Sequence, residues 1–537
     1  MSQSTSRSQS LSAVTLADGW ELQRVTPASR LYGANGLRTA ADGRLYVAQV
    51  SGSQISAIDV DSGMISTVSP MGGAIVAPDD LAFDDHGNLF ATEISEGRVS
   101  MLTPSGATRV VYGDLPCANP ITIHQGRLFA GECRHEGRIV ELDLDGGAPR
   151  TLIENVPMPN AMEVGPDGKL YFPVMEANEI WRLDLKGGKP EVVARNLGVP
   201  DSVKFDAEGF IVSTQAATGQ VLRISPATGE KTQLAQLAPG LDNLSFVGGR
   251  LFVSSFSGEI TEILAGGQTR SLLPSGFNGP MGLTCDEQGC LVIADGPYCY
   301  ALRPGGEPQV LGMLFTPGSP GYSRGIAAAG GGEFIVTTGL GQVARWNPFE
   351  QSSQVLAQGF DRLFGVAVDK RGAAIVAEAG RGRLLGIASG EVTELATGLN
   401  QPRGVAITDD GEYLVAEEGA GRVVKVGHGC ADIVVDGLQR PHGIATAGER
   451  LYVLDAGERS LIEFHRASGT RTTLAADLPV SAPPGISPRP IHPFPPLSGA
   501  MGPFSDLALG ADGTLYICAD AEGSVLALRP AHAVGQV

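Results

Sequence analysis

Six Asn and Asp residues recur at one place in a repeat that fills the first half of this chain. Hard cations such as Ca²⁺ bind about six to eight oxygen ligands from carboxylates and amides. Carboxylates brought together repel one another unless a cation or bound protons neutralise them. The pattern therefore predicts a divalent-cation site, with calcium as the expected ion, built from Asn35, Asp79, Asn119, Asn160, Asp201 and Asp242.

The second half of the chain provides an internal comparison for this position. Its residues there are Met281, Arg324, Phe364, Arg403, His442 and Ser505. The repeat itself therefore does not require Asn or Asp. A second explanation for the first half remains open, because Asn and Asp also cap the turns that enter strands.

Arg324, Arg403 and His442 form the polar part of the second set. Clustered Arg side chains suit a carboxylate, a halide or another anionic group, and His can transfer protons near neutral pH. The alternative is that each Arg pairs with a local acid. The acids available on neighbouring strand ends are Glu378, Glu417, Glu418 and Asp455.

The elements that must position these residues are the strands of a repeat of about forty residues. Each copy has a polar residue, a small residue, an alternating strand, a Gly-containing turn and a second apolar strand, as in 35–48 and 403–416. Twelve copies are present, and each predicts four short antiparallel strands without a helix. Such units are β-propeller blades, and known rings hold about four to eight of them. We therefore expect an all-β chain of two six-bladed propellers, with the aligned positions lining each channel mouth.

Both ends of the chain bear on how the rings close. Blade twelve lacks a fourth strand, and the segment 20–25 has no other role, so we expect it to close the last blade. The expected division is 1–19 without structure, 20–30 with the closing strand, 31–275 as the first propeller and 276–537 as the second. The Pro-rich segment 478–504 leads into an innermost strand, and we expect it to form a lid over the second mouth, joined by the shorter insertion 314–322.

The blades resemble a known superfamily through their Asp-Gly-Xaa-Leu-Tyr-Val cores and copies such as Gln401-Pro-Arg-Gly-Val-Ala. They are similar to NHL-repeat, gluconolactonase–regucalcin and strictosidine-synthase-like propellers, and to bacterial streptogramin lyases. The resemblance implies a divalent metal at the channel mouth, with Asn119, Asn160 and Asp201 on positions of the family's metal set. The family's Glu position holds Asn35, so the resemblance leaves the hydrolytic base to Asp79 or Asp242.

Composition narrows the partners and the compartment. The net charge is −19 and no basic cluster occurs, which argues against nucleic acid as a partner. No apolar run is long enough to span a membrane, and the Ser-rich N-terminus does not resemble a signal peptide. Seven widely spaced cysteines fit reduced, mostly buried thiols. These features predict a cytoplasmic protein.

Together these observations predict a small-molecule hydrolase or lyase, similar to lactonases and esterases, that acts at a channel mouth with a divalent cation. One alternative is a metal-free enzyme that binds an anionic substrate at the Arg/His mouth of the second propeller. Another is a non-catalytic NHL-type scaffold for a protein partner. Metal content separates the first possibility from the other two.

Overall fold

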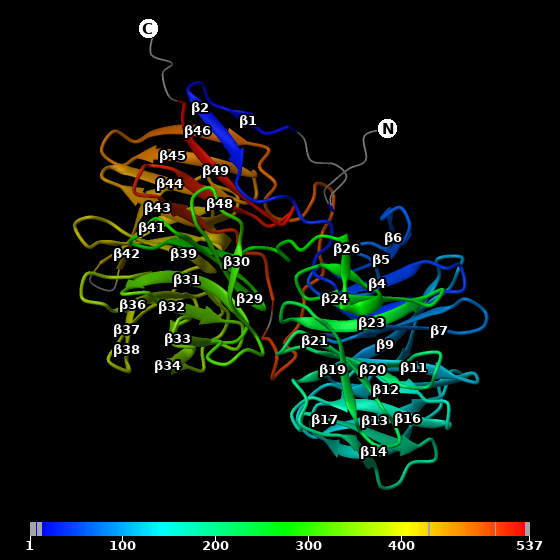
Figure 1. Cartoon of the computed structure of the whole chain (residues 1–537). Helices are drawn as coiled ribbons and strands as arrows, with labels where there is room; N and C mark the ends of the chain where they lie inside the picture. The colour runs from blue at the N-terminus through cyan, green and yellow to red at the C-terminus, as the bar shows by residue number, and fades with distance from the viewer. Residues whose placement is uncertain (1–6, 8–12, 428–429, 500, 532–537) are drawn as a thin grey trace. The chain divides into compact units, whose positions relative to one another are not determined.

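The computed structural model describes residue 7 and residues 13–427, 430–499 and 501–531. Within these residues the chain forms twelve antiparallel sheets, which confirms the predicted pair of six-bladed propellers (Figure 1). The contacts divide the chain into two compact units. We call Arg30–Gly276 with Ile486–Pro496 the first propeller, and the remainder the second propeller. No helix among the described residues has the length and apolar character needed to cross a membrane.

The turn between the first two strands of a blade shows why the repeat folds locally. In the second blade, Asp84 Oδ1 accepts hydrogen bonds from the backbone N–H groups of His86 and Asn88. Gly87 follows with a φ of 77°, which residues with a side chain rarely adopt. Asp and Gly at this spacing therefore fix a tight turn, and the alternating apolar residues on either side pack between neighbouring blades.

The first propeller has four strands in every blade and one short 3₁₀ helix, η1 (Ala265–Gly267). Its strands, in order from the innermost strand of each blade outward, are β3 (Leu37–Thr39), β4 (Leu45–Gln49), β5 (Gln54–Ile58), β6 (Ile65–Ser69); β7 (Pro78–Phe83), β8 (Leu89–Glu93), β9 (Arg98–Leu102), β10 (Thr108–Tyr112); β11 (Ala118–His124), β12 (Arg127–Glu132), β13 (Gly137–Leu142), β14 (Arg150–Val156); β15 (Glu163–Val164), β16 (Lys169–Val174), β17 (Glu179–Asp184), β18 (Glu191–Ala194); β19 (Pro200–Phe205), β20 (Ile211–Gln215), β21 (Gln220–Ile224), β22 (Lys231–Gln236); β23 (Leu241–Val247), β24 (Arg250–Ser255), β25 (Ile260–Ile263) and β26 (Thr269–Leu273).

The second propeller repeats this plan and adds the 3₁₀ helix η2 (Glu418–Ala420). Its strands are β27 (Gly282–Cys285), β28 (Leu291–Asp295), β29 (Tyr298–Leu302), β30 (Gln309–Met313); β31 (Ser323–Gly330), β32 (Glu333–Thr338), β33 (Gln342–Asn347), β34 (Ser352–Gln358); β35 (Leu363–Val368), β36 (Ala374–Glu378), β37 (Arg383–Ala388), β38 (Glu391–Ala396); β39 (Pro402–Ile407), β40 (Tyr413–Glu417), β41 (Arg422–Gly427), β42 (Cys430–Val435); β43 (Pro441–Ala447), β44 (Arg450–Asp455), β45 (Ser460–His465), β46 (Thr470–Ala476); β47 (Leu507–Leu509), β48 (Leu515–Ala519) and β49 (Ser524–Pro530).

The N-terminal segment closes the second propeller, as the sequence predicts. The strand β2 (Trp20–Arg24) pairs antiparallel with β49 and becomes the outer strand of the last blade (Figure 1). A further strand, β1 (Thr15–Leu16), pairs with β46 of the preceding blade. It lies inside the stretch 1–19, for which we expected no structure; residues 1–6 and 8–12 of that stretch lie outside the described residues.

We expect Leu22→Ala to destabilise the second propeller alone. Leu22 is half-buried and packs against the cluster that contains Leu515, Ile517 and Leu528. Its truncation should lower the free energy of unfolding by about 1–3 kcal/mol, below the range for a fully buried leucine. Calorimetry should show a lower midpoint for one of two transitions. Leu264→Ala, at an exposed position of the first propeller, should leave both midpoints unchanged; equal curves for all three proteins would contradict the closing role of β2.

Candidate functional site

Six Asn and Asp residues were predicted at the mouth of the first propeller, and the structure links Asn35, Asp79, Asp201 and Asp242 of this set by a hydrogen bond and by mutual charge effects. Four of the six are the second residue of an innermost strand, namely of β7, β11, β19 and β23. Hydroxyl groups on the second strands fix these positions: Thr92 Oγ1 donates to the carbonyl of Asn119 at 2.7 Å, and Ser254 Oγ donates to the carbonyl of Asn35 at 2.7 Å. Five of the six side chains are buried, and Asn35 is half-buried.

Two of the amides already have local partners. Asn35 Oδ1 accepts from the N–H of Val50 at 3.1 Å, and its Nδ2 donates to Asp242 Oδ2 at 3.0 Å. Asn160 Oδ1 accepts from the N–H of Ala161 at 2.7 Å. Turn capping therefore accounts for the amide oxygens of Asn35 and Asn160. Asp242, in contrast, accepts its hydrogen bond from the side chain of Asn35.

The pKa values of all three carboxyl groups of the ring are raised, first of all by burial. Burial, followed by the charge of Asp80, raises the pKa of Asp79 to about 8. Burial and the charges of Asp79 and Asp80 raise the pKa of Asp201 well above its ordinary value. The pKa of Asp242 rises by burial and by the charges of Asp201 and Asp79, although its hydrogen bond from Asn35 opposes the shift. Among the described residues, no positive charge is one of the causes that act on these three pKa values.

A hard divalent cation fits this set of donors. Asp201 Oδ1 is buried without a hydrogen-bond partner, so it retains an oxygen for a ligand. Asp79, Asn119 and Asp242 complete an oxygen-only set of the kind that Ca²⁺ prefers. Among the described residues, however, no group of three or more His, Cys, Asp or Glu side chains is arranged as a ready set of metal ligands. A cation site at this mouth would therefore need at least one amide oxygen in addition to carboxylates.

Below the mouth, charged side chains fill the channel. Arg38 Nη1 lies 2.7 Å from Glu163 Oε2, and Lys204 Nζ lies 3.3 Å from the same oxygen. Burial raises the pKa of Asp80, while the positive charges of Arg38 and Lys204 offset part of that rise. Asp80 also accepts backbone N–H groups and the amide of Asn243 at 3.1 Å. Asp80 and Asn243 thus serve this internal network, which the sequence analysis did not identify.

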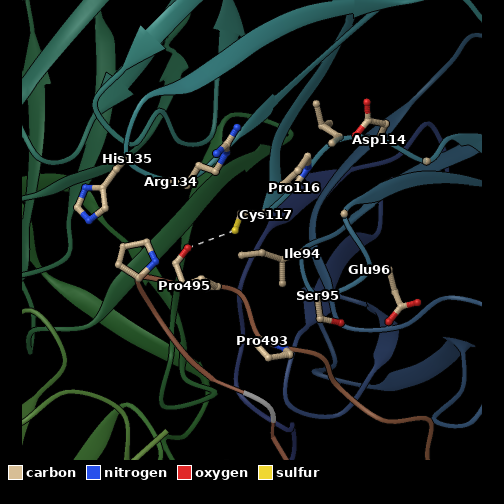
Figure 2. Close-up of a pocket in the computed structure, with 14 residues that line it drawn as sticks. Ile94, Ser95, Glu96, Asp114, Pro116, Cys117, Arg134, His135, Pro493 and Pro495 are labelled. Carbon is tan, nitrogen blue, oxygen red and sulfur yellow. Dashed lines mark hydrogen bonds between the residues drawn. The ribbon is translucent and has the colours of Figure 1, made fainter. Parts of the chain in front are cut away.

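A pocket of about 530 Å³ opens beside this mouth on the face of the first propeller (Figure 2). One wall comes from the segments that follow β8 and precede β11, and another from Arg134 and His135 after β12. Pro493 and Pro495 cover it, and Cys117 Sγ donates to the carbonyl of Pro495 at 3.4 Å. The pocket therefore combines apolar proline surfaces with an Arg, a His and a buried thiol.

Cys117 connects the pocket to the Asn/Asp ring along the chain. Cys117 lines the pocket and stands two residues before Asn119 of the ring. Burial raises the pKa of Cys117 to about 11, and the charge of Asp79 adds to that rise. Cys133, whose N–H donates to the carbonyl of Cys117 at 2.9 Å, has its pKa raised by burial and then by Asp79 and Asp201. The charge of Asp79 therefore reaches both Cys117, which lines the pocket, and Cys133.

The Pro-rich segment divides between the two propellers. We expected 478–504 to cover the second mouth, but Ile486–Pro496 packs with the first propeller. His492 Nε2 lies 3.6 Å from Glu96 Oε1 there, and Ser487 lies against Gly72. The later residues return to the second propeller, where Phe504 is fully buried. Prolines cannot extend a strand ladder, so side-chain packing alone decides where such a segment lies.

Without a divalent cation, we expect the stability of the first propeller to fall as the pH rises from about 4 to about 8. Folded Asp79 keeps its proton up to a pKa of about 8, whereas an unfolded Asp loses its proton near pH 3.9. This stabilising contribution is complete below the unfolded pKa and is lost as the pH passes through the folded pKa. Calcium should flatten or reverse the slope, and calorimetry from pH 4 to 8.5 in chelator and in calcium measures it.

The second propeller supplies the control for this measurement. Burial raises the pKa of both Asp295 and Asp506 to about 7, so its stability should also fall with rising pH. Both carboxyl groups accept backbone N–H groups and lie away from the first mouth. Calcium should leave this second slope unchanged; the same response of both transitions would contradict a cation site confined to the first mouth.

At the mouth of the second propeller, the Arg/His set meets one acid. Arg403 Nε donates to Glu418 Oε2 at 2.5 Å, and Arg440 Nη2 lies 2.9 Å from Glu418 Oε1. His442 Nε2 lies 3.5 Å from the same oxygen. The other expected acids face elsewhere: Glu378 and Glu417 pair with Arg383 and Arg422, and Asp455 accepts backbone N–H groups.

Aromatic side chains form the rest of this second mouth. The guanidinium of Arg403 lies 3.9 Å from the ring centre of Phe364, and that of Arg324 lies 5.2 Å from the same centre. Phe504 packs against both Phe364 and His442, with ring centres 5.6 and 6.2 Å apart. The structure thus brings the predicted Arg324, Arg403 and His442 together. Phe504 was not predicted, although its place just before the innermost strand of the last blade was a usable signal.

Comparison with known families gives one match, within the first propeller. The family described as "SMP-30/Gluconolactonase/LRE-like region" matches residues 121–257. This region includes Asn160, Asp201 and Asp242 and begins just after Asn119. The match confirms the resemblance expected from the repeats over this part of the chain. No curated protein matches the chain.

Several solved structures are similar to about half of the chain. A streptogramin B lyase is 19% identical, with a TM-score of 0.39, covering 51% of this chain and 94% of its own. A catalytically inactive virginiamycin B lyase from Staphylococcus aureus with quinupristin is 18% identical, with a TM-score of 0.38, covering 51% and 96%. A nidogen/laminin complex is 21% identical, with a TM-score of 0.39, covering 43% and 93%.

Proposed function

We propose that the chain is a small-molecule hydrolase or lyase that acts on a carbonyl substrate at the mouth of the first propeller. The observation that carries the proposal is the group of three buried carboxyl groups with raised pKa values, Asp79, Asp201 and Asp242. The charge of Asp79 also reaches Cys117, which lines the pocket. Pockets of this size take small ligands, and buried carboxyl groups with raised pKa values are typical of sites of proton transfer. The family match over 121–257 supports the same class of reaction.

Asn119, Asp201 and Asp242 are the residues that would hold a divalent cation, and calcium is the expected ion. When bound, such a cation polarises a substrate carbonyl and stabilises negative charge on its oxygen. The hydrogen bond from Asn35 orients Asp242 for this role, and Asp201 keeps an oxygen without a partner. The oxygen-rich donors favour a hard cation over zinc, for which nitrogen and sulfur ligands are usual.

Asp79 is the proposed general base, because burial raises its pKa to about 8 and its charge reaches Cys117 of the pocket. A carboxyl group whose pKa lies near neutrality is suited to taking up and returning a proton. In hydrolysis Asp79 would remove a proton from the attacking water and return it to the leaving oxygen. In elimination it would remove the proton from the carbon next to the carbonyl, and the leaving oxygen would depart with the bonding electrons.

Turnover of a panel of lactones, aryl esters and cyclic depsipeptides tests this proposal. Mass spectrometry separates the two reactions, since hydrolysis adds one water to the substrate and elimination adds none. We expect turnover that requires a divalent cation, stops in chelator and is lost in Asp201→Asn. Asp145→Asn, an exposed turn carboxylate of the same propeller, should keep full activity. Turnover that persists in chelator and in Asp201→Asn would contradict the proposed site.

A further inference from the structure

The mouth of the second propeller is positively charged in a chain whose net charge is −19. Arg403 and Arg440 bind Glu418, and Arg324 stacks on the same Phe364 as Arg403. The charge of Arg362 also reaches both Arg324 and Arg403. Glu418 is the buried carboxylate of this group, and the exposed Asp361 lies 3.5 Å from Arg362. Among the described residues, Glu418 is thus the buried acid that pairs with the Arg side chains of this mouth.

Glu418 has little capacity left for further donors. Its Oε1 accepts from Arg440 Nε at 3.0 Å and lies 2.9 Å from Arg440 Nη2. Its Oε2 accepts from Arg403 Nε at 2.5 Å. The distance of 3.5 Å from His442 Nε2 to Oε1 is at the outer limit for a hydrogen bond. A further donor at this mouth therefore gains little from Glu418.

Two such donors are present. Arg403 Nη1 and His442 Nε2 are both buried without a hydrogen-bond partner. Nη1 belongs to the part of the guanidinium that faces away from the Nε–H, and so away from Glu418. His442 Nδ1 accepts the N–H of Ser505 at 3.3 Å, which leaves the ring proton on Nε2. Buried donors of this kind are rare in folded proteins, and those that occur are commonly occupied by a ligand or an ordered water.

We propose that the mouth of the second propeller binds a small carboxylate, whose two oxygens accept from Arg403 Nη1 and His442 Nε2. Guanidinium groups bind carboxylates strongly, and Arg324 contributes a second positive charge. Phe364, Phe504 and the neighbouring Met281 form an apolar wall for the rest of the molecule. This site belongs to the second propeller. The proposal holds whether or not the mouth of the first propeller is catalytic.

We propose a carboxylate rather than another anion because it offers one oxygen to each of the two donors and carries an organic group for the apolar wall. A phosphate dianion would need more donors than these two side chains supply. Arg324, Phe364 and His442 are nearly or completely inaccessible to solvent, so the bound molecule must be small.

Thermal unfolding of the full-length protein in sodium acetate, sodium benzoate and sodium chloride at equal ionic strength tests the proposal. We expect acetate or benzoate to raise the midpoint of the second propeller in a saturable manner, because a ligand that binds only the folded state stabilises it. Chloride should have no saturable effect. Equal shifts in all three salts would overturn the proposal and indicate general screening, and no shift in any salt would indicate that water occupies the donors.

Variants then assign the binding to the two donors. Titration calorimetry should show affinity for acetate or benzoate reduced by about 10- to 100-fold in Arg403→Gln and in His442→Phe, the effect of losing a charged hydrogen bond. His442→Gln keeps a side-chain N–H donor and should retain most of the affinity. It therefore shows whether a loss in His442→Phe comes from the missing donor or from misfolding. Arg345→Gln, which removes a half-exposed Arg of the same propeller, is the matched control. Unchanged affinity in both Arg403→Gln and His442→Phe would overturn the assignment.

Discussion

Asp79→Asn is expected to lower kcat/KM by about 10²- to 10⁴-fold, the range for loss of a general base. The amide preserves the size of the side chain but cannot accept a proton. The same substitution should stabilise the metal-free first propeller above about pH 8, because it removes a buried charge at the pKa of Asp79. Steady-state kinetics and calorimetry on one preparation measure the two effects.

These opposite effects separate a chemical role of Asp79 from a structural one. A variant that loses activity because it misfolds would also lose stability. Asp145→Asn makes the same chemical change at an exposed turn and should alter neither quantity. Full activity in Asp79→Asn would show that another group is the general base. Asp242 is the carboxylate of the ring that would then be tested.

Glu418→Gln should lower the free energy of unfolding of the second propeller by about 3–5 kcal/mol, because it leaves a buried positive charge without its partner. Burial opposes the ionisation of Glu418, but His442 and Arg403 outweigh that effect and hold its pKa well below the ordinary range. Its contribution is therefore complete above pH 4.5 and is lost only as the pH falls through the lower folded pKa. Denaturant unfolding at pH 7 measures the loss.

Glu412→Gln is the matched control for this change. Glu412 pairs with Lys425 and Arg466 near the surface, where an ion pair contributes about 0–1 kcal/mol. A loss in Glu418→Gln no larger than that in Glu412→Gln would show that Arg403 finds another partner when Glu418 is neutral. In that case the positive charge of Arg403 would not depend on Glu418 alone for its partner.

The fold was predictable because each blade carries its own local signals. In the fourth blade, Pro166-Asp-Gly separates β15 from β16, and Lys186-Gly-Gly separates β17 from β18. The innermost strand β15 begins only at Glu163, and the N–H of Ala161 just before it donates to Asn160 Oδ1. Alternation and turn residues thus locate strands well, whereas side-chain capping shifts their ends.

The candidate sites were only partly predictable. Alignment of the repeats identified the residues at each mouth, since every blade presents the same position to its channel. The alignment did not reveal the pocket that Cys117 lines. It also did not reveal that Ile486–Pro496 packs with the first propeller. These features depend on contacts between residues hundreds of positions apart, and no periodicity encodes such contacts. The repeat also gave no sign that Arg38, Glu163 and Lys204 fill the first channel.

The metal content of the purified protein tests most directly whether the mouth of the first propeller holds a divalent cation. Full-length protein should be dialysed against trace calcium and analysed by elemental mass spectrometry, alongside Asp201→Asn and Asp145→Asn. The account predicts one divalent cation per chain in the wild-type protein and in Asp145→Asn, and none in Asp201→Asn. A wild-type protein that retains no cation, or an Asp201→Asn variant that retains as much as the wild type, would contradict it.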